Sequence, residues 1–285
     1  MPLRNRNRNT IPNFRNVSGA GFTGLLDEYG GAAAAYSVRR LSSTYEGELI
    51  EVRRSSDNTT QDIGYDSNGD LDTASLLLFV GAGDGFVRTW YDQSSNANNA
   101  TQTTAASQPR IVINGSLVTE NGEAAVSFDG INDNFKMTSS TTITNNISSF
   151  AVCQIVSETD FNFIYDTVGS NKRIRLGLWS TNHYFSDNGD AALAQSSVLS
   201  DGLRHLFFAR HTSSNASISV DNESLISSVS ASFSSGFTEL VIGSRDNEVD
   251  HWLDGKIQEF IIYPSDQSSN RTAIESNINS YFSIY

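Results

Sequence analysis

The chain of 285 residues has a single cysteine, Cys153. One cysteine excludes an intrachain disulfide and any zinc site built on cysteines. The four histidines do not form a metal-binding spacing either; they are His183, His205, His211 and His251. The fold must therefore be held by an apolar core, which a chain of this length can supply.

Long apolar runs are also missing. No stretch of 18 apolar residues occurs, and Met1 is followed by a polar, arginine-rich segment where a secretory signal would have an apolar one. We therefore expect a protein made in the cytoplasm without a signal peptide and without membrane insertion. The net charge of −13 argues against nucleic-acid binding, because that requires a basic face.

Basic residues are scarce but are concentrated at the start of the chain. Residues 1–30 are predicted to form an N-terminal arm, with no acidic residue before Asp27. In an extended chain, alternate side chains project from one face. The arm is interpreted either as a segment that docks on an acidic neighbour in a larger assembly or as a disordered tail. Its arginines are Arg4, Arg6, Arg8 and Arg15.

Residues 31–112 contain both helical and strand patterns. The alanine-rich segment from 30 to 45 has helical propensity and spacing. Residues 70–81 also predict a helix, with an acidic start and a glycine as a stop. Alternating apolar residues predict strands at 50–56 and 86–93.

Residues 113–285 have the sequence pattern of a β-protein. Short apolar or alternating runs are separated by Asn, Asp, Gly or Ser, which favours a sandwich over an α/β fold. Asp221-Asn222 suits a tight hairpin turn, and the last residues predict a short helix. We expect one all-β jelly-roll sandwich with a few short helices over residues 31–285. From residue 110 on, the predicted strands are 110–113, 124–130, 148–156, 173–179, 205–211, 216–224, 239–244 and 255–263.

Two stretches resemble known families. RRLSSTY, VRRSSDN and WYDQS follow one another at matching intervals within residues 35–112, and this block resembles the N-terminal part of the arabinofuranosidase B catalytic domain. AAVSFDGINDNF at 124–135 and VIGSRDNEVDHWLDGKIQEFIIYPSD at 241–266 resemble laminin G-like and other concanavalin A-like jelly rolls. The resemblance implies a concanavalin A-like sandwich with an arabinofuranosidase-like block (31–112) and a laminin G-like block (113–285).

The chemistry implied by the first resemblance is glycoside hydrolysis of the α-L-arabinofuranosidase type. A retaining glycosidase needs two carboxyl groups about 5–5.5 Å apart. The fungal enzymes take their nucleophile from a glutamate in the middle of the sandwich, within an ADLEN-like motif, and they are disulfide-bonded. This chain has no glutamate between Glu158 and Glu223 and no such motif. No catalytic residue is therefore assigned from the sequence, and hydrolysis stays the alternative hypothesis.

The combination of the two blocks in one chain gives the leading hypothesis. A chain that joins these two halves without signal or disulfides resembles virion proteins of bacteriophages of aquatic bacteria, such as tail fibres, spikes and capsid decorations. It implies a non-enzymatic, homo-oligomeric surface protein located in the virion, with the arm contacting other virion proteins. A lectin-like sandwich that binds host-surface glycans is one form of this hypothesis, and a purely structural subunit without a ligand is another.

A candidate carbohydrate site follows from the aromatic residues. Sugar binding needs an aromatic face and a few fixed polar groups in a concave surface. Trp179 ends an apolar run and is followed by a polar loop, and it is the preferred sugar contact. The other proposed contacts are His183, Tyr184 and Asp187.

A calcium site is predicted where oxygen ligands cluster near Trp252. Calcium prefers carboxylate and amide oxygens, although acids in turns more often accept backbone hydrogen bonds. Asp129 and Asp133 can likewise be interpreted as calcium ligands or as turn formers. The proposed calcium ligands are Asp246, Asn247, Asp250 and Asp254.

The segment TWYDQSSNANNATQ (89–102) has the residues of a sugar site but not the geometry. In a strand, Trp90 and Asp92 point to one face and Tyr91 and Gln93 to the other. We therefore interpret the segment as a fold signature, with Trp90 in the core and the two polar residues organising the following turn.

Overall fold

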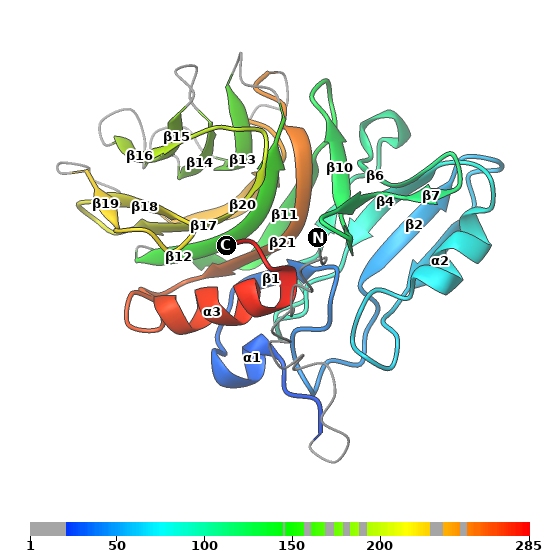
Figure 1. Ribbon diagram of the computed structural model, residues 1–285, viewed down its shortest axis with the longest axis horizontal. Helices are drawn as coiled ribbons and strands as arrows, with labels where there is room; N and C mark the ends of the chain where they lie inside the picture. Colours follow the sequence, from blue (N-terminus) through cyan, green and yellow to red (C-terminus); the bar gives the residue numbers. More distant parts are fainter. Residues whose placement is uncertain are drawn as a thin grey trace, which may run out of the picture.

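The computed structural model describes residues 21–285, apart from 145, 157–160, 169–173, 179–182, 188–192, 229–235 and 246–249. The described residues form a β-sandwich of two layers, with short helices at its periphery (Figure 1). The predicted all-β jelly-roll class is confirmed.

One layer, here called the α3-side layer, has the strand order β19-β18-β17-β12-β21, and β21 also pairs with β1 and β10. Helix α3 lies along this layer (Figure 1). The elements are β1 (Ala34–Ser37), β10 (Val126–Asp129), β12 (Ile147–Ile155), β17 (Arg204–His211), β18 (Ala216–Val220), β19 (Ile226–Ser227), β21 (Asp254–Tyr263) and α3 (Arg271–Phe282).

The second layer, here called the open layer, has the order β16-β15-β14-β13-β20-β11-β5. All its neighbouring strands are antiparallel. The elements are β5 (Ala100–Thr101), β11 (Phe135–Ile143), β13 (Asn162–Thr167), β14 (Arg175–Leu178), β15 (His183–Asp187), β16 (Leu193–Leu199) and β20 (Phe237–Ile242).

The remaining strands belong mostly to the N-terminal block. β4 pairs with β2, β5 and β6, and so it joins this block to the open layer. The elements are β2 (Ile50–Arg54), β3 (Thr60–Ile63), β4 (Gly85–Trp90), β6 (Arg110–Ile113), β7 (Ser116–Leu117), β8 (Thr119–Glu120), β9 (Glu123–Ala124), α1 (Leu25–Glu28), α2 (Thr73–Val80) and the 3-10 turn η1 (Ala105–Ser107).

Aromatic side chains fill the space between the layers. Tyr165 of β13 packs on Phe260 of β21, with ring centroids 5.2 Å apart. Trp90 lies between Tyr36 and Phe135, at centroid distances of 6.0 and 6.1 Å. Interdigitated rings of this size dominate core energetics, so no disulfide or metal is needed to explain the stability of the sandwich.

The alanine-rich segment predicted to be helical is a strand. β1 pairs with β21 from Ala34↔Ile262 to Ser37↔Glu259, and all four of its residues are buried. Its alanines have high helical propensity, but a small side chain also fits a strand buried on both faces. Tertiary burial therefore outweighs a propensity of a few tenths of a kcal/mol per residue.

Several predicted elements are confirmed. Helix α2 begins after Asp72, which accepts a hydrogen bond from the Ser75 backbone N–H at 3.0 Å, and ends at Gly81. The hairpin turn after β18 has positive φ at Asp221 (51°) and Asn222 (60°), as a two-residue hairpin loop requires. The predicted C-terminal helix is α3.

In the open layer, the sequence did not predict β5, β11, β13, β15 and β16. Several carry Ser, Thr, Asn or Asp at alternating positions, and their apolar runs are short. Five of the seven strands of this layer were therefore not predicted.

The interpretation of Trp90 and its neighbours as a fold signature agrees with the structure. Trp90 is fully buried, and its indole N–H donates to the Ser37 carbonyl at 3.2 Å. Asp92 accepts from the backbone N–H groups of Ala35 (2.8 Å) and Asn98 (2.9 Å). Gln93 accepts from the Leu41 N–H and donates to the Arg39 carbonyl. The two polar side chains hold three chain segments together.

The start of the described chain belongs to the sandwich. Leu25 of α1 is 1% exposed and lies in the core, which places α1 with the domain and not with the arm expected to reach residue 30. No helix in the described part of the chain is long and apolar enough to cross a membrane.

Candidate functional site

The outer face of the open layer carries a row of mostly polar residues. Tyr165 points into the core, so the next residue on β13, Asp166, belongs to the opposite face. Paired residues of antiparallel strands share a face, and the strand register continues this line in both directions. Its positions, here called the charged row, are Glu51, Thr89, Thr101, Lys136, Val241, Asp166, Arg175 and Asp187.

The centre of the charged row is buried. Asp166 has no exposed surface, and Arg175 is 9% exposed. They are direct cross-strand neighbours, and the Cβ atoms of such pairs lie about 4.5–5.5 Å apart. Charged residues are rarely buried in this way unless they are paired or have a function.

An aromatic group lies beside the charged row. Phe163 packs edge-on against Phe185, with centroids 5.6 Å apart, and the Arg175 guanidinium carbon is 5.9 Å from the Phe163 ring. His251 contacts the rings of Phe163 (5.4 Å) and Phe161 (4.8 Å). The turn that contains His251 is therefore held against this face, and His251 itself has a positive φ of 56°.

Asp250, next to His251, adds a second carboxyl group. Its Oδ2 lies 3.4 Å from Arg245 Nη1. Its Oδ1 is buried, and none of the residues that the structure describes donates a hydrogen bond to it. Asp166, Arg175 and the His251 imidazole thus lie with aromatic rings on one side of the sandwich, and Asp250 precedes His251 in the turn. Acids that donate and accept protons, donors for hydroxyl groups and rings for sugar C–H groups are the components of a glycosidase site.

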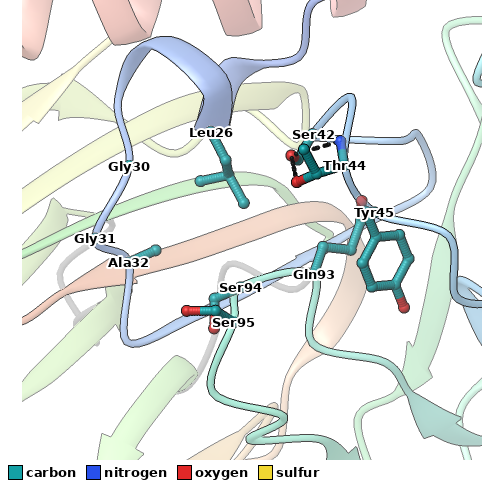
Figure 2. Close-up of a pocket in the computed structure, with 10 residues that line it drawn as sticks. All are labelled: Leu26, Gly30, Gly31, Ala32, Ser42, Thr44, Tyr45, Gln93, Ser94 and Ser95. Atoms are coloured by element: carbon teal, nitrogen blue, oxygen red, sulfur yellow. Dashed lines mark hydrogen bonds between the residues drawn. The ribbon is translucent and has the colours of Figure 1, made fainter.

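A separate cavity of about 310 Å³ lies in the N-terminal block. Figure 2 shows its lining side chains around an open space, with Leu26 and Ala32 on one side and Tyr45 and Gln93 on the other. No charged side chain lines it. The lining residues, here called the N-terminal pocket, are Leu26, Gly30, Gly31, Ala32, Ser42, Thr44, Tyr45, Gln93, Ser94 and Ser95.

The predicted sugar contacts are only partly placed. Trp179 lies outside the described residues. His183 and Asp187 are the first and last residues of β15, and Asp187 occupies a position of the charged row. Tyr184 is a core residue: it is fully buried and packs on Phe207 at 4.8 Å. A side chain enclosed between the layers cannot contact a sugar on the surface.

The predicted calcium ligands are not gathered in what the structure describes. Asp246 and Asn247 lie outside it. Asp250 pairs with Arg245, and Asp254 is cross-strand to Asp129 at the start of β21. The described residues contain no group of three or more His, Cys, Asp or Glu that could hold a metal ion. Calcium binding stays a prediction.

Asp129 acts as a turn former. Its Oδ1 accepts from the backbone N–H groups of Ile131 (2.9 Å) and Asn132 (3.1 Å). Asp133 Oδ2 accepts from the Asp129 N–H at 3.1 Å. Burial, and next to it the Asp129 charge, raise the pKa of Asp133 to about 7.

The arm arginines Arg4, Arg6, Arg8 and Arg15 lie outside the described residues. Docking of the arm, contacts with other virion proteins and homo-oligomerisation stay predictions.

The sequence reasoning missed Asp166, Arg175 and Phe163 as site residues. One signal was present: Asp166 is an acid that directly follows three apolar residues in the segment NFIYDT. The pairing of this segment with β14 and β20 could not be derived from the sequence, so the row itself was not predictable.

The family comparison agrees with the first resemblance. Residues 28–132 match the sequence model of the catalytic domain of alpha-L-arabinofuranosidase B. A search of curated proteins found no match.

Solved structures with a similar fold include arabinofuranosidases. The chain resembles a GH54 α-L-arabinofuranosidase soaked with a cyclic sulfate inhibitor (TM-score 0.71) and a mutant GH54 α-L-arabinofuranosidase soaked with 4-nitrophenyl α-L-arabinofuranoside (0.72). A third is an arabinofuranosidase complexed with arabinofuranosyl-alpha-1,2-xylobiose (0.66). In each case the identity is 20%, and the alignment covers 90% of this chain and 65% of the other. The chain thus spans less than two thirds of these proteins.

These comparisons correct the leading hypothesis. The family model and the three structures point to arabinofuranosidases and away from a non-enzymatic virion surface protein, tail fibre or capsid decoration. That hypothesis was wrong because it treated the missing glutamate, signal and disulfides as stronger signals than the block at 35–112.

Proposed function

We propose that this protein is a glycoside hydrolase that acts on α-L-arabinofuranosyl residues at the outer face of the open layer. The observation that carries the proposal is the buried Asp166–Arg175 pair in a row of polar residues, on a chain whose residues 28–132 match the arabinofuranosidase B catalytic model. The arabinofuranosidase-like fold supports it.

Asp166 and Asp250 supply the two carboxyl groups that hydrolysis needs. One protonates the departing glycosidic oxygen, while the other attacks the anomeric carbon or activates a water molecule. Aspartates take these roles because no glutamate occurs between Glu158 and Glu223. The fixed strand position of Asp166 and the turn held on Phe163 would keep the two groups on either side of the sugar.

Arg175 and His251 act as binding groups in this proposal. The Arg175 guanidinium is a donor with fixed geometry that can bind sugar hydroxyl oxygens. The His251 imidazole is held against Phe161 and Phe163. Sugar rings present C–H groups that pack on aromatic surfaces, while their hydroxyls need such polar groups at the rim.

The proposal is tested by hydrolysis of 4-nitrophenyl α-L-arabinofuranoside. The wild-type protein is expected to release 4-nitrophenol, and Asp166→Asn and Asp250→Asn should each lower kcat by about 10²–10⁴-fold, as expected for the loss of a catalytic carboxyl group. Asp266→Asn is the matched control. Asp266 pairs with Arg210 of the α3-side layer, so its replacement should leave kcat unchanged. A folded wild-type protein that does not hydrolyse the substrate would contradict the proposal.

A further inference from the structure

The N-terminal pocket is built from three chain segments that are held in place independently of any ligand. Asp27 accepts hydrogen bonds from the Gly24 N–H (2.7 Å), the Ser43 N–H (2.8 Å) and the Ser42 hydroxyl (2.8 Å). Gln93 bridges to Leu41 and to Arg39. The walls at 26–32, 42–45 and 93–95 are thus fixed to one another, and a ligand would find the cavity already formed.

Unused hydrogen-bond donors border this pocket. Among the residues that the structure describes, none accepts a hydrogen bond from the backbone N–H of Gly31, Ala32 or Ser95. Ala32 is only 4% exposed, and buried backbone N–H groups nearly always have a partner. The Ser95 hydroxyl likewise has no hydrogen bond to any residue that the structure describes. The Thr44 hydroxyl forms a hydrogen bond with the Ser42 hydroxyl.

The chemistry of the lining selects a neutral ligand. No lining side chain is charged, and the Asp27 carboxylate is bonded directly to Ser42 in a chain with a net charge of −13. The negative charge of Asp27 and of the whole chain disfavours an anionic ligand. A cationic ligand is disfavoured because the pocket offers it N–H donors, which a cation cannot accept. Hydroxyl oxygens suit the free N–H groups, while Leu26 and the Tyr45 ring offer apolar surface. A volume of about 310 Å³ lies at the lower end of the roughly 300–1,000 Å³ range of small-molecule sites.

We propose that the N-terminal pocket is a second, non-catalytic site that binds one neutral sugar residue. It is separate from the charged row and contains no carboxyl group that could assist hydrolysis. Its role is to hold a saccharide on the protein, so it does not depend on the proposed hydrolytic activity.

The test titrates the full chain separately with L-arabinose, D-xylose and D-galactose while the amide signals are followed by NMR. At least one sugar should shift the amide signals of Gly31, Ala32 and Ser95 in a saturable way. Ser95→Phe fills the pocket at an exposed position and should weaken this binding at least tenfold. The matched control, Ser116→Phe in β7, is exposed and lies outside the pocket, and it should bind like the wild type.

The outcomes separate this proposal from the hydrolase proposal. Ser95→Phe should hydrolyse 4-nitrophenyl α-L-arabinofuranoside at the wild-type rate, whereas Asp166→Asn should lose hydrolysis and keep the pocket shifts. If no sugar shifts these three amides, or if Ser95→Phe binds as the wild type does, the pocket is not a sugar site. Loss of hydrolysis in Ser95→Phe would also overturn the assignment of a non-catalytic site.

Discussion

At the scale of the residue, Asp133 shows how burial changes the chemistry of a turn. The residue is 4% exposed and follows Asp129 in the same loop, and the pKa of its carboxyl group is raised to about 7. In the unfolded chain the pKa is near the ordinary value of about 3.9. Between these two values the folded protein holds a proton that the unfolded chain has lost. The contribution of Asp133 to the free energy of unfolding therefore falls as pH rises from about 4 to about 7 and is constant above that.

Replacing Asp133 with Asn tests this pH dependence. Asn keeps an oxygen that can accept from the Asp129 N–H, but it carries no charge. Above pH 7 the variant should be more stable than the wild type, on the order of 2 kcal/mol, and below pH 4 the difference should nearly vanish. Thermal melts at pH 4, 6 and 8 would measure it.

The control for this prediction is Asp66→Asn. Asp66 is an exposed turn acid that accepts from the Asn68 N–H at 2.8 Å. If Asp133→Asn is less stable than the wild type at pH 8, the charge of Asp133 has a partner that offsets its burial.

The position of a single residue was predictable where residues close to it in the sequence determine whether its side chain is buried. Trp90 was assigned to the core and Asp92 to the turn because strand alternation and side-chain to backbone bonding act over a few residues. Tyr184 was assigned to a sugar site because it lies in the polar segment that follows Trp179. The structure buries Tyr184 against Phe207, a contact between strands that no local pattern reveals.

At the scale of the element, β1 is fixed by a buried ion pair. Glu259 of β21 accepts from the Ser37 hydroxyl (2.7 Å) and from Arg39 Nε (2.8 Å). The Glu259 side chain is 1% exposed and that of Arg39 10%. The pair explains how a short alanine-rich strand is held in register beside β21.

Removing one partner should destabilise the fold strongly. Glu259→Ala leaves Arg39 buried without its carboxylate, which costs about 3–5 kcal/mol. Replacing both residues, Arg39→Met with Glu259→Met, should recover much of this loss, because no unpaired charge remains. Urea unfolding of the single and double variants measures the difference. Glu46→Ala, at an exposed position, is the control, and equal losses in the single and double variants would show that the charge is not the cause.

The elements were predicted unevenly for a physical reason. α2 and α3 have their own capping or amphipathic signals, and β12, β17 and β21 each contain four consecutive apolar residues. β13 (NFIYDT) and β15 (HYFSD) have only two or three consecutive apolar residues between polar ones, and neither strand alternates strictly. Neither pattern that identifies a strand is therefore complete in these segments.

At the scale of the whole molecule, the sandwich followed from sequence while the site did not. The blocks at 35–112 and 241–266 carry family resemblance, which is a property of the chain. The charged row exists only through the pairing of eight strands, from β2 to β15. Asp166 and Asp250 are 84 positions apart in the printed sequence, and no spacing rule connects them.

The most direct test of the central claim is the position of a bound sugar. Crystals of Asp166→Asn soaked with 4-nitrophenyl α-L-arabinofuranoside should retain the uncleaved substrate. We expect its arabinofuranosyl ring on the outer face of the open layer, between positions 166 and 250 and in contact with Arg175. A substrate bound only elsewhere, with this face empty, would contradict the assignment of the site.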